Sequence, residues 1–253
     1  MDLELKGKKA VVTGGTKGIG RAVAEKLAGE GADVAICARN ADEVAATVKA
    51  LQAKGVKASG AAIDIAKASD LKKWIADSAQ ALGGIDIIVC NVSALAVNKD
   101  EESWAAEFNV DMMGTVRAIE AAMPYLEKSK AASIVVISSV SGVEIDFAAG
   151  PYGAMKAALI HYTSGLSSQL ASKGIRANTV SPGNTYFKDG VWHRIEQGMP
   201  DLYKSALASN PMGRMAKPDE IANAVVFLAS PAASFVTGTN LVVDGALTKR
   251  VQF

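Results

Sequence analysis

Short apolar runs alternate with longer amphipathic segments along the chain, and this alternation constrains the fold more than any other feature. The runs lack the polar alternation of half-exposed strands, so they predict strands of a parallel sheet that is covered on both faces. They lie at 10–12, 34–36, 63, 85–89, 134–137, 177–180 and 241–243, separated by amphipathic segments at 18–29, 40–53, 69–82, 103–128, 152–172 and 217–229. The predicted fold class is α/β, a doubly wound parallel sheet of about seven strands with helices on both faces.

Composition narrows the class of protein. With 253 residues, 49% of them hydrophobic, the chain can bury a substantial core, and we expect a single domain over residues 1–253. The formal net charge is +1 and charges of both signs are interspersed, which argues against a nucleic-acid partner or a membrane partner. The start of the chain does not resemble a secretory signal, and no run approaches the roughly 20 apolar residues of a membrane span. A cytoplasmic protein is therefore expected.

Cysteine and histidine usage gives no sign of a metal site. Cys37 and Cys90 each end an apolar run, so we expect them to be buried as small hydrophobic side chains. His161 and His193 are far apart in the sequence, and no paired Cys/His spacing is present.

Residues 184–212 form the only long stretch that fits neither pattern, and we expect it to be irregular. It is rich in aromatic residues, methionines and prolines, including Tyr186, Phe187, Trp192 and Met199. Such a composition suits a lid over a substrate pocket, although an ordinary packed surface loop is nearly as consistent with it.

A glycine-rich turn follows the first predicted strand and opens the first predicted helix. It reads Thr13-Gly14-Gly15-Thr16-Lys17-Gly18-Ile19-Gly20. Glycines here would let the backbone turn tightly and approach a pyrophosphate at the helix N-terminus. The G-x-x-x-G-x-G spacing differs from the common G-x-G-x-x-G fingerprint, but its position between strand and helix is the one that a dinucleotide site in a Rossmann-type sheet requires.

The end of the second predicted strand indicates which dinucleotide would bind. An NAD site normally places an acidic residue there to hold the ribose hydroxyls, and none is present at 37–40. Arg39, together with Lys17 in the glycine turn, would instead suit the charge of a 2′-phosphate. The sequence therefore predicts NADP(H) in preference to NAD(H).

Tyr152 and Lys156 form a candidate proton-transfer pair, since i,i+4 residues share one face of a helix. At roughly 4 Å and an effective dielectric of about 20, a cation favours the phenolate by up to about 4 kcal/mol. The pair would then exchange protons near neutral pH, which a tyrosine with a pKa of about 10 does poorly alone. Such pairs also occur by chance in many helices, so this one needs support from the rest of the chain.

From about residue 6 to about residue 246, the chain resembles the classical short-chain dehydrogenase/reductase family. The matching elements, in order, are residues 13–20, 64–65, 85–93, 137–139, 152–156, 175–183, 236–238 and 243–245. The resemblance implies an NADP(H)-dependent oxidoreductase that interconverts a carbonyl and a secondary alcohol by hydride transfer. It also implies a homotetramer assembled through the helices predicted at 103–128 and 152–172.

The resemblance assigns roles to individual residues. Tyr152 would be the general acid in reduction and the general base in oxidation, Lys156 would lower its pKa and hold the nicotinamide ribose, and Ser139 would hydrogen-bond the substrate oxygen. The implied cofactor-binding residues are Gly14, Thr16, Lys17, Gly18, Ile19, Gly20, Arg39, Asp64, Ile65, Asn91, Tyr152, Lys156, Pro182, Gly183 and Thr185. The expected substrate pocket contains Ser93, Leu95, Ser139, Phe147, Tyr186 and Trp192.

Two departures from the family pattern bear on the site. The usual Asn-Asn-Ala-Gly reads Cys-Asn-Val-Ser at 90–93, so contacts on the adenosine side are expected to shift. The family's catalytic asparagine, which usually holds a water linking Lys156 to solvent, falls on Asp111. An ionised Asp111 would offset part of the effect of Lys156 on Tyr152, whereas a protonated one could imitate the amide. We hypothesise that Asp111 takes the place of the asparagine in the proton relay.

Two other functions remain open from the sequence. Reduction of 3-oxoacyl thioesters is common for chains of this kind, but the altered segment at 90–93 and the aromatic stretch make it the second choice. A cofactor-binding regulatory protein with little turnover is the alternative from another class, suggested by Asp111. The intact Ser139, Tyr152 and Lys156 argue against it.

Overall fold

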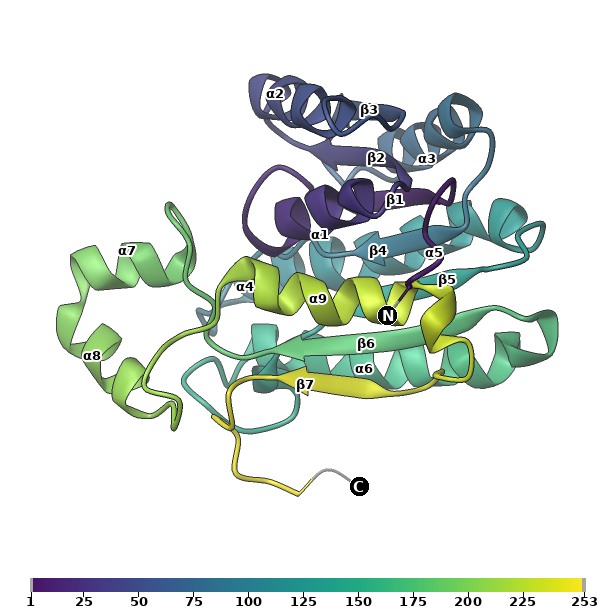
Figure 1. Cartoon of the computed structure of the whole chain (residues 1–253). Helices are drawn as coiled ribbons and strands as arrows, with labels where there is room; N and C mark the ends of the chain where they lie inside the picture. The colour runs from purple at the N-terminus through teal and green to yellow at the C-terminus, as the bar shows by residue number, and fades with distance from the viewer. Residues whose placement is uncertain (1, 252–253) are drawn as a thin grey trace.

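The computed structural model describes residues 2–251 and contains a seven-stranded sheet in the order β3-β2-β1-β4-β5-β6-β7 (Figure 1). The strands are β1 (Lys9–Thr13), β2 (Asp33–Ala38), β3 (Ala58–Ala62), β4 (Ile87–Cys90), β5 (Ser133–Ile137), β6 (Arg176–Pro182) and β7 (Asn240–Val243). All six pairings are parallel. The strand order reverses direction between β1 and β4, so the predicted doubly wound α/β fold is confirmed.

Helices cover both faces of this sheet. The helices α1 (Gly18–Gly29), α2 (Ala41–Gln52) and α9 (Pro218–Ala229) pack on one face, and α3 (Ala68–Leu82), α5 (Met113–Leu126) and α6 (Pro151–Leu170) pack on the other (Figure 1). Neighbouring strand residues serve different faces, since Val12 joins the core under α1 and Val11 the core under α3. Both faces are therefore apolar, which is why the central strands show no polar alternation.

Strand β3 differs from the prediction. It reads Ala-Ser-Gly-Ala-Ala and ends at Ala62. The apolar residue from which the strand was predicted, Ile63, lies just after it. A Cβ at Gly60 would lie 2.7 Å from Val44 Cγ1 and 2.9 Å from Val48 Cγ2, so α2 packs against nearly bare backbone. A strand made of small residues at the edge of a sheet leaves no apolar run for a sequence pattern to detect.

The helix predicted over 103–128 is interrupted. It consists of α4 (Glu101–Glu107), a π-helical turn (Phe108–Met112) and α5. Asp100 caps α4 through a hydrogen bond of 2.7 Å from Ser103 N to its Oδ1. A π-helical turn holds an extra residue in the helix and is often found at functional sites. Asp111 lies in this turn and is fully buried.

Residues 184–212 are not irregular, so that expectation was wrong. They contain α7 (Val191–Gly198) and α8 (Pro200–Ala208), and Pro200 occupies the first turn of α8, where proline is well tolerated. Trp192 and Ile195 are the buried centre of a small apolar cluster, against which Tyr186 packs. The aromatic content of the stretch thus serves its own core, and the two helices project beyond the edge at which β6 ends (Figure 1).

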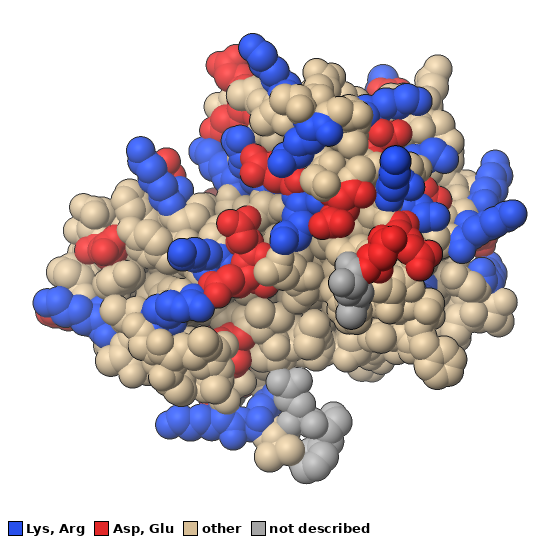
Figure 2. Space-filling view, in the orientation of Figure 1, with Lys and Arg blue, Asp and Glu red and all other residues tan. Residues whose placement is uncertain are grey.

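The remaining broad features concern burial and charge. Cys37 and Cys90 are buried, as predicted. Within residues 2–251, no helix is both long and apolar enough to cross a membrane. On the face shown in Figure 2, basic and acidic side chains are interspersed.

Arg176 links the start of β6 to the end of α9. Its guanidinium donates hydrogen bonds to the carbonyl groups of Leu228 at 2.7 Å, Ser230 at 3.0 Å, and Ala229 and Val236 at 3.3 Å. The carbonyl groups at a helix C-terminus have no partners within the helix, so this side chain satisfies them.

Replacing Arg176 with methionine should lower the free energy of unfolding by about 2–3 kcal/mol, because buried carbonyl groups lose their donor. The matched control is Lys173→Met, which removes an exposed pair with Glu127 and should cost less than about 1 kcal/mol. Urea unfolding followed by circular dichroism measures both variants. Equal losses in the two variants would contradict the proposed role of Arg176.

Candidate active site

The predicted site residues meet at one edge of the sheet. Because the strands are parallel, their carboxyl ends lie on the same side, where open α/β sheets bind ligands. The glycine turn follows β1, Asn91 follows β4, Ser139 follows β5, and 183–185 follows β6. Helix α6 carries Tyr152 and Lys156 to the same edge.

The turn after β1 depends on glycine at three positions. Gly14 and Gly18 have φ values of +67° and +52°, and a Cβ at Gly20 would lie 2.2 Å from Gly14 O. Asn91 Nδ2 donates to the carbonyl groups of Thr13 and Gly14 at 3.2 and 3.3 Å, which holds the turn against the end of β4. Helix α1 begins at Gly18 without a side-chain cap, so its first N–H groups remain available to a phosphate group.

Phe187 covers this turn from the segment after β6. A Cβ at Gly18 would lie 2.5 Å from Phe187 Cζ, so the ring rests directly on the glycine. The same ring would meet a Cβ at Gly190 at 2.9 Å. Residues 184–212 therefore contact the glycine turn at a point where any side chain would prevent the approach.

The charges beside the turn differ in part from the prediction. Lys17 Nζ forms an ion pair of 2.8 Å with Glu43 Oε1, and Thr16 Oγ1 donates to Glu43 Oε2 at 3.2 Å. Glu43 lies in the first turn of α2, so the sequence interpretation, which looked for an acid only at 37–40, missed it. Arg39 is exposed and makes no ion pair or side-chain hydrogen bond within the described residues. Its guanidinium is therefore free to meet an anion, whereas Lys17 must first leave Glu43.

The other predicted cofactor residues lie at the ends of β3 and β6. Asp64 Oδ1 accepts from Ala66 N at 3.0 Å, and Ile65 is buried. Pro182 ends β6, and a Cβ at Gly183 would lie 2.8 Å from Asp244 Cβ, so the residue that follows β7 passes very close. Thr185 Oγ1 donates to Gly183 O at 3.1 Å.

Close backbone packing places Ser139 beside α6. Ser138 Oγ donates to Lys156 O at 2.8 Å, and a Cβ at Gly142 would lie 2.7 Å from the Lys156 carbonyl carbon. Lys156 Nζ lies 5.5 Å from the centre of the Tyr152 ring. Ser139 Oγ donates to Ser141 Oγ at 3.3 Å and accepts from Ser141 N at 3.1 Å, and Ser139 is near enough to the Tyr152 phenol to lower its pKa. The structure therefore brings Ser139, Tyr152 and Lys156 together.

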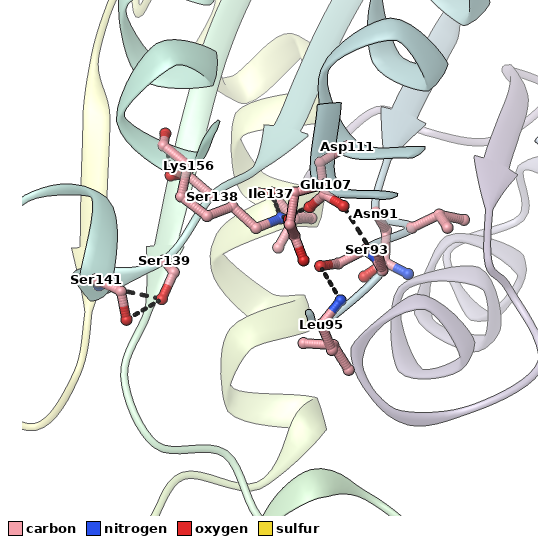
Figure 3. A network of polar contacts seen from close by, with 12 residues as sticks. Asn91, Ser93, Leu95, Glu107, Asp111, Ile137, Ser138, Ser139, Ser141 and Lys156 are labelled. Atoms are coloured by element: carbon pink, nitrogen blue, oxygen red, sulfur yellow. Dashed lines mark hydrogen bonds and ion pairs between the residues drawn. The ribbon is translucent and has the colours of Figure 1, made fainter. Parts of the chain in front are cut away.

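Lys156 is almost fully buried and is held from two sides (Figure 3). Its Nζ donates to Ile137 O at 3.1 Å and forms an ion pair of 2.9 Å with Asp111 Oδ1. Burial alone would lower the pKa of Lys156, but the negative charges around it, Asp111 first, outweigh burial and raise the pKa. Lys156 therefore remains a cation at neutral pH.

The net pKa of Tyr152 is raised, although Lys156 itself acts to lower it as expected. Burial is the largest cause, and the nearby carboxyl groups of Asp111 and Glu107 add to it. Lys156 and Ser139 lower the pKa, but their effect is smaller than that of burial and the carboxyl groups together. In this arrangement Tyr152 keeps its proton at neutral pH. Asp111 offsets part of the effect of Lys156 on Tyr152, which is the outcome expected for an ionised Asp111.

Glu107 is a residue at this site that the sequence interpretation missed. It is fully buried at the end of α4, and its Oε1 accepts from Ala96 N at 2.6 Å. Asp111 Oδ2 accepts from Ala94 N at 2.8 Å, so the two carboxyl groups hold the segment after β4, in which Leu95 has a φ of +54°. The position of Glu107, four residues before Asp111 on a helix, was the available signal.

A cavity of ≈ 250 Å³ lies between the loop after β5 and the helices α7 and α8. Its lining includes the apolar side chains of Val140, Phe147 and Trp192 and the polar side chains of Asp146, Asn184 and Thr248. The rings of Phe147 and Trp192 meet edge to face, with centres 5.9 Å apart.

The other predicted pocket residues, Tyr186, Ser93, Leu95 and Ser139, do not line this cavity. Tyr186 donates to Glu196 and packs against α7 and α8. Ser93 Oγ accepts from Leu95 N at 3.1 Å, on the far side of the site, and neither residue lines the cavity. Ser139 directly precedes the lining residue Val140.

Comparison with known proteins places this architecture in a family. The family model described as Enoyl-(Acyl carrier protein) reductase matches residues 14–248. Isoepoxydon dehydrogenase of Penicillium expansum is 41% identical over 256 residues, which cover 98% of each chain. Dehydrogenase/reductase SDR family member 4 of Oryctolagus cuniculus is 33% identical over 254 residues, covering 98% of this chain and 96% of that protein. The chain belongs to the short-chain dehydrogenase/reductase family.

A solved structure of the same kind supports this assignment. L-sorbose reductase from Gluconobacter frateurii, in complex with NADPH and L-sorbose, matches with a TM-score of 0.90 and 28% identity, covering 99% of this chain and 100% of that one. The resemblance seen in the sequence is thus confirmed, and the chain is a short-chain dehydrogenase/reductase of the oxidoreductase class.

In this short-chain dehydrogenase/reductase, Asp111→Asn should lower the pKa of Tyr152, because it removes one of the carboxyl groups that raise it. An absorbance titration of phenolate, with the Tyr152→Phe protein subtracted, measures the change. The control Asp77→Asn removes an exposed acid of α3 and should leave the titration where it is. A Tyr152 titration that is the same in Asp111→Asn and wild type would contradict the charge balance described above.

Proposed function

We propose that this protein is an NADP(H)-dependent oxidoreductase that interconverts a carbonyl and a secondary alcohol, with Tyr152 as the general acid and base. The observation that carries the proposal is the buried ammonium of Lys156, held by Ile137 O and Asp111 and lying 5.5 Å from the centre of the Tyr152 ring. Burying a cation is costly unless it is paired, so a lysine that served only packing would gain nothing from this position. Membership of an oxidoreductase family and the adjacent cavity support the same function.

The chain's own residues would handle the proton and the substrate oxygen. Bound NADP(H) supplies the hydride in reduction and accepts it in oxidation. Ser139 donates a hydrogen bond to the substrate oxygen, where negative charge grows in the transition state. Tyr152 gives its proton to that oxygen in reduction and takes it back in oxidation, and Lys156 stabilises the phenolate left behind.

The raised pKa of Tyr152 favours carbonyl reduction at neutral pH. Reduction needs the protonated phenol, which is the form present below its pKa, whereas oxidation needs the phenolate. Asp111, placed where the family has asparagine, would act in the proton relay by setting the charge that faces Lys156.

NADP(H) fits the glycine turn between β1 and α1. The glycines at 14, 18 and 20 let the turn fold tightly, and the uncapped start of α1 offers N–H groups to the phosphates. Arg39 would meet the 2′-phosphate, with Lys17 joining once it leaves Glu43. Asp64, Ile65 and Asn91 would hold the adenosine, and 182–185 would lie along the nicotinamide.

The cavity favours a small substrate with both apolar and polar parts. Phe147 and Trp192 provide the apolar contact, and Asp146, Asn184 and Thr248 provide polar groups. Isoepoxydon is therefore the first compound to test, given the relative named for it. A 3-oxoacyl thioester is the second, because the description of the matching family model, Enoyl-(Acyl carrier protein) reductase, names an acyl group on a carrier protein.

Three further expectations from the sequence belong to this proposal. Residues 1–253 act as one domain, in which 184–212, with α7 and α8, form a lid over the cavity. A homotetramer assembles through α4, α5 and α6. The single domain with its lid, the homotetramer and the cytoplasmic location stay predictions.

Tyr152→Phe should reduce kcat by about 10²–10⁴-fold and leave the Kd for NADPH nearly unchanged, because the ring remains while the transferable proton is lost. NADP(H)-dependent turnover of isoepoxydon, L-sorbose and a 3-oxoacyl thioester, with fluorescence titration of NADPH, provides both measurements. The control Tyr125→Phe changes a tyrosine of α5 outside the site and should keep wild-type turnover. NADPH binding without turnover of any carbonyl or alcohol by wild type would instead favour the regulatory protein.

Arg39→Asp should reverse the preference for NADPH over NADH, since a carboxylate repels the 2′-phosphate and suits a ribose diol. Glu43→Gln should tighten NADPH binding by about threefold to tenfold, because it releases Lys17 and removes a nearby negative charge. Dissociation constants from fluorescence titration check both variants. Equal affinity of wild type for the two cofactors would defeat the assignment of Arg39.

A further inference from the structure

Glu107 and Asp111 present two buried carboxyl groups to the ammonium of Lys156 (Figure 3). Both carboxyl side chains are 0% exposed, and Lys156 is 2% exposed. Each carboxyl has one oxygen that accepts from a backbone N–H, that of Ala96 for Glu107 and that of Ala94 for Asp111. The second oxygen of each carboxyl, Glu107 Oε2 and Asp111 Oδ1, accepts no hydrogen bond from a backbone N–H.

Glu107 Oε2 and Asp111 Oδ1 are two of the three buried side-chain nitrogen and oxygen atoms in residues 2–251 that have no hydrogen-bond partner. Asp111 Oδ1 does touch Lys156 Nζ at 2.9 Å, but as an ion pair rather than as a well-directed hydrogen bond. When both groups are ionised, both oxygens are acceptors and neither can satisfy the other. A proton on Glu107 Oε2 turns an acceptor into a donor and resolves the conflict.

The charge balance of the site leads to the same arrangement. Two carboxylates beside one ammonium would leave a net negative charge in a buried place, and like charges at close range disfavour ionisation of both. Burial, and then the charge of Asp111, raises the pKa of Glu107 to about 7.

We propose that Glu107 is a positioning residue of the active site that shares one proton with Asp111 and donates a hydrogen bond from Oε2 to Asp111 Oδ1. This inference rests on the proposed function, because Glu107 acts on the reaction only through Lys156 and Tyr152. With the proton in place, the carboxyl pair presents one negative charge to Lys156, and the two charges compensate.

Loss of the shared proton changes the charge around the phenol. The groups that face Glu107 are Asp111 on the π-helical turn, Lys156 and Tyr152 on α6, and the neutral amide of Ala96. A second negative charge raises the pKa of Tyr152 further, so the phenol holds its proton more firmly as the pH rises through about 7. Carbonyl reduction is thereby sustained in this range, and alcohol oxidation is held back.

Glu107→Gln separates this role from a purely structural one. The glutamine amide oxygen still accepts from Ala96 N, and its NH2 group can donate to Asp111, so the anchoring of the segment after β4 is kept. Glutamine cannot lose a proton, so it imitates the protonated state at every pH. The matched control is Glu102→Gln, which removes an exposed carboxyl from the same helix.

The first readout needs neither substrate nor cofactor. Infrared spectra of the full chain should show the carbonyl band of a protonated carboxylic acid at about pH 6, where exposed carboxyl groups are ionised. The band should disappear as the pH passes about 7, be absent in Glu107→Gln, and persist in Glu102→Gln. Absence of the band in wild type would overturn the proposal.

The second readout tests the effect on Tyr152. Glu107→Gln should move the phenolate titration of Tyr152 to lower pH, and Glu102→Gln should not. With isoepoxydon and NADP⁺, Glu107→Gln should oxidise the alcohol about threefold to tenfold faster than wild type above pH 7, with KM unchanged. A Tyr152 titration identical in Glu107→Gln and wild type would overturn the positioning role. If wild type turned over none of the tested compounds while the infrared and titration results were as expected, the proposed function would be overturned instead.

Discussion

The buried ion pair between Lys156 and Asp111 connects the parts of the structure that make up the site. Lys156 comes from α6, its second partner is the carbonyl group of Ile137 at the end of β5, and Asp111 comes from the π-helical turn before α5. Removing either partner would leave an uncompensated charge in the interior, which costs several kcal/mol. The relative positions of these three elements are therefore constrained by one charge, and the close backbone contacts at Gly142 let α6 approach far enough to satisfy it.

Charge balance, more than the spacing of tyrosine and lysine, controls the phenol. A lysine beside a tyrosine favours the phenolate, but burial and two carboxyl groups work in the opposite direction, and the net result is a raised pKa. The site is thus poised to donate a proton at neutral pH. Asp111, which holds Lys156 in place, also helps to set how readily Tyr152 gives its proton away, so structure and acid–base chemistry cannot be changed independently here.

Much of the fold and many of the site residues could be read from the sequence. The apolar runs located most strands, the glycine turn lay where a dinucleotide site requires it, and the ordered motifs identified the family. Other elements left no such signal. Strand β3 is built of small residues against which α2 packs, and the aromatic stretch at 184–212 was taken as irregular because α7 and α8 are short and amphipathic around their own small core. Glu43 went unnoticed as a partner of Lys17 because it lies beyond the end of β2, and only the fold brings its carboxylate back to that side chain.

By itself, the sequence determined the features that depend on neighbouring residues: buried strands, glycines in a tight turn, a phenol and an ammonium one helical turn apart, and an acid in place of the family's asparagine. Only the tertiary structure decided how these groups act on one another. The π-helical turn brings Asp111 to Lys156, burial removes the water that would screen their charges, and Glu107 joins them from the end of α4. Desolvation and the distance between charges on different elements set proton affinities, and neither is a property of local sequence.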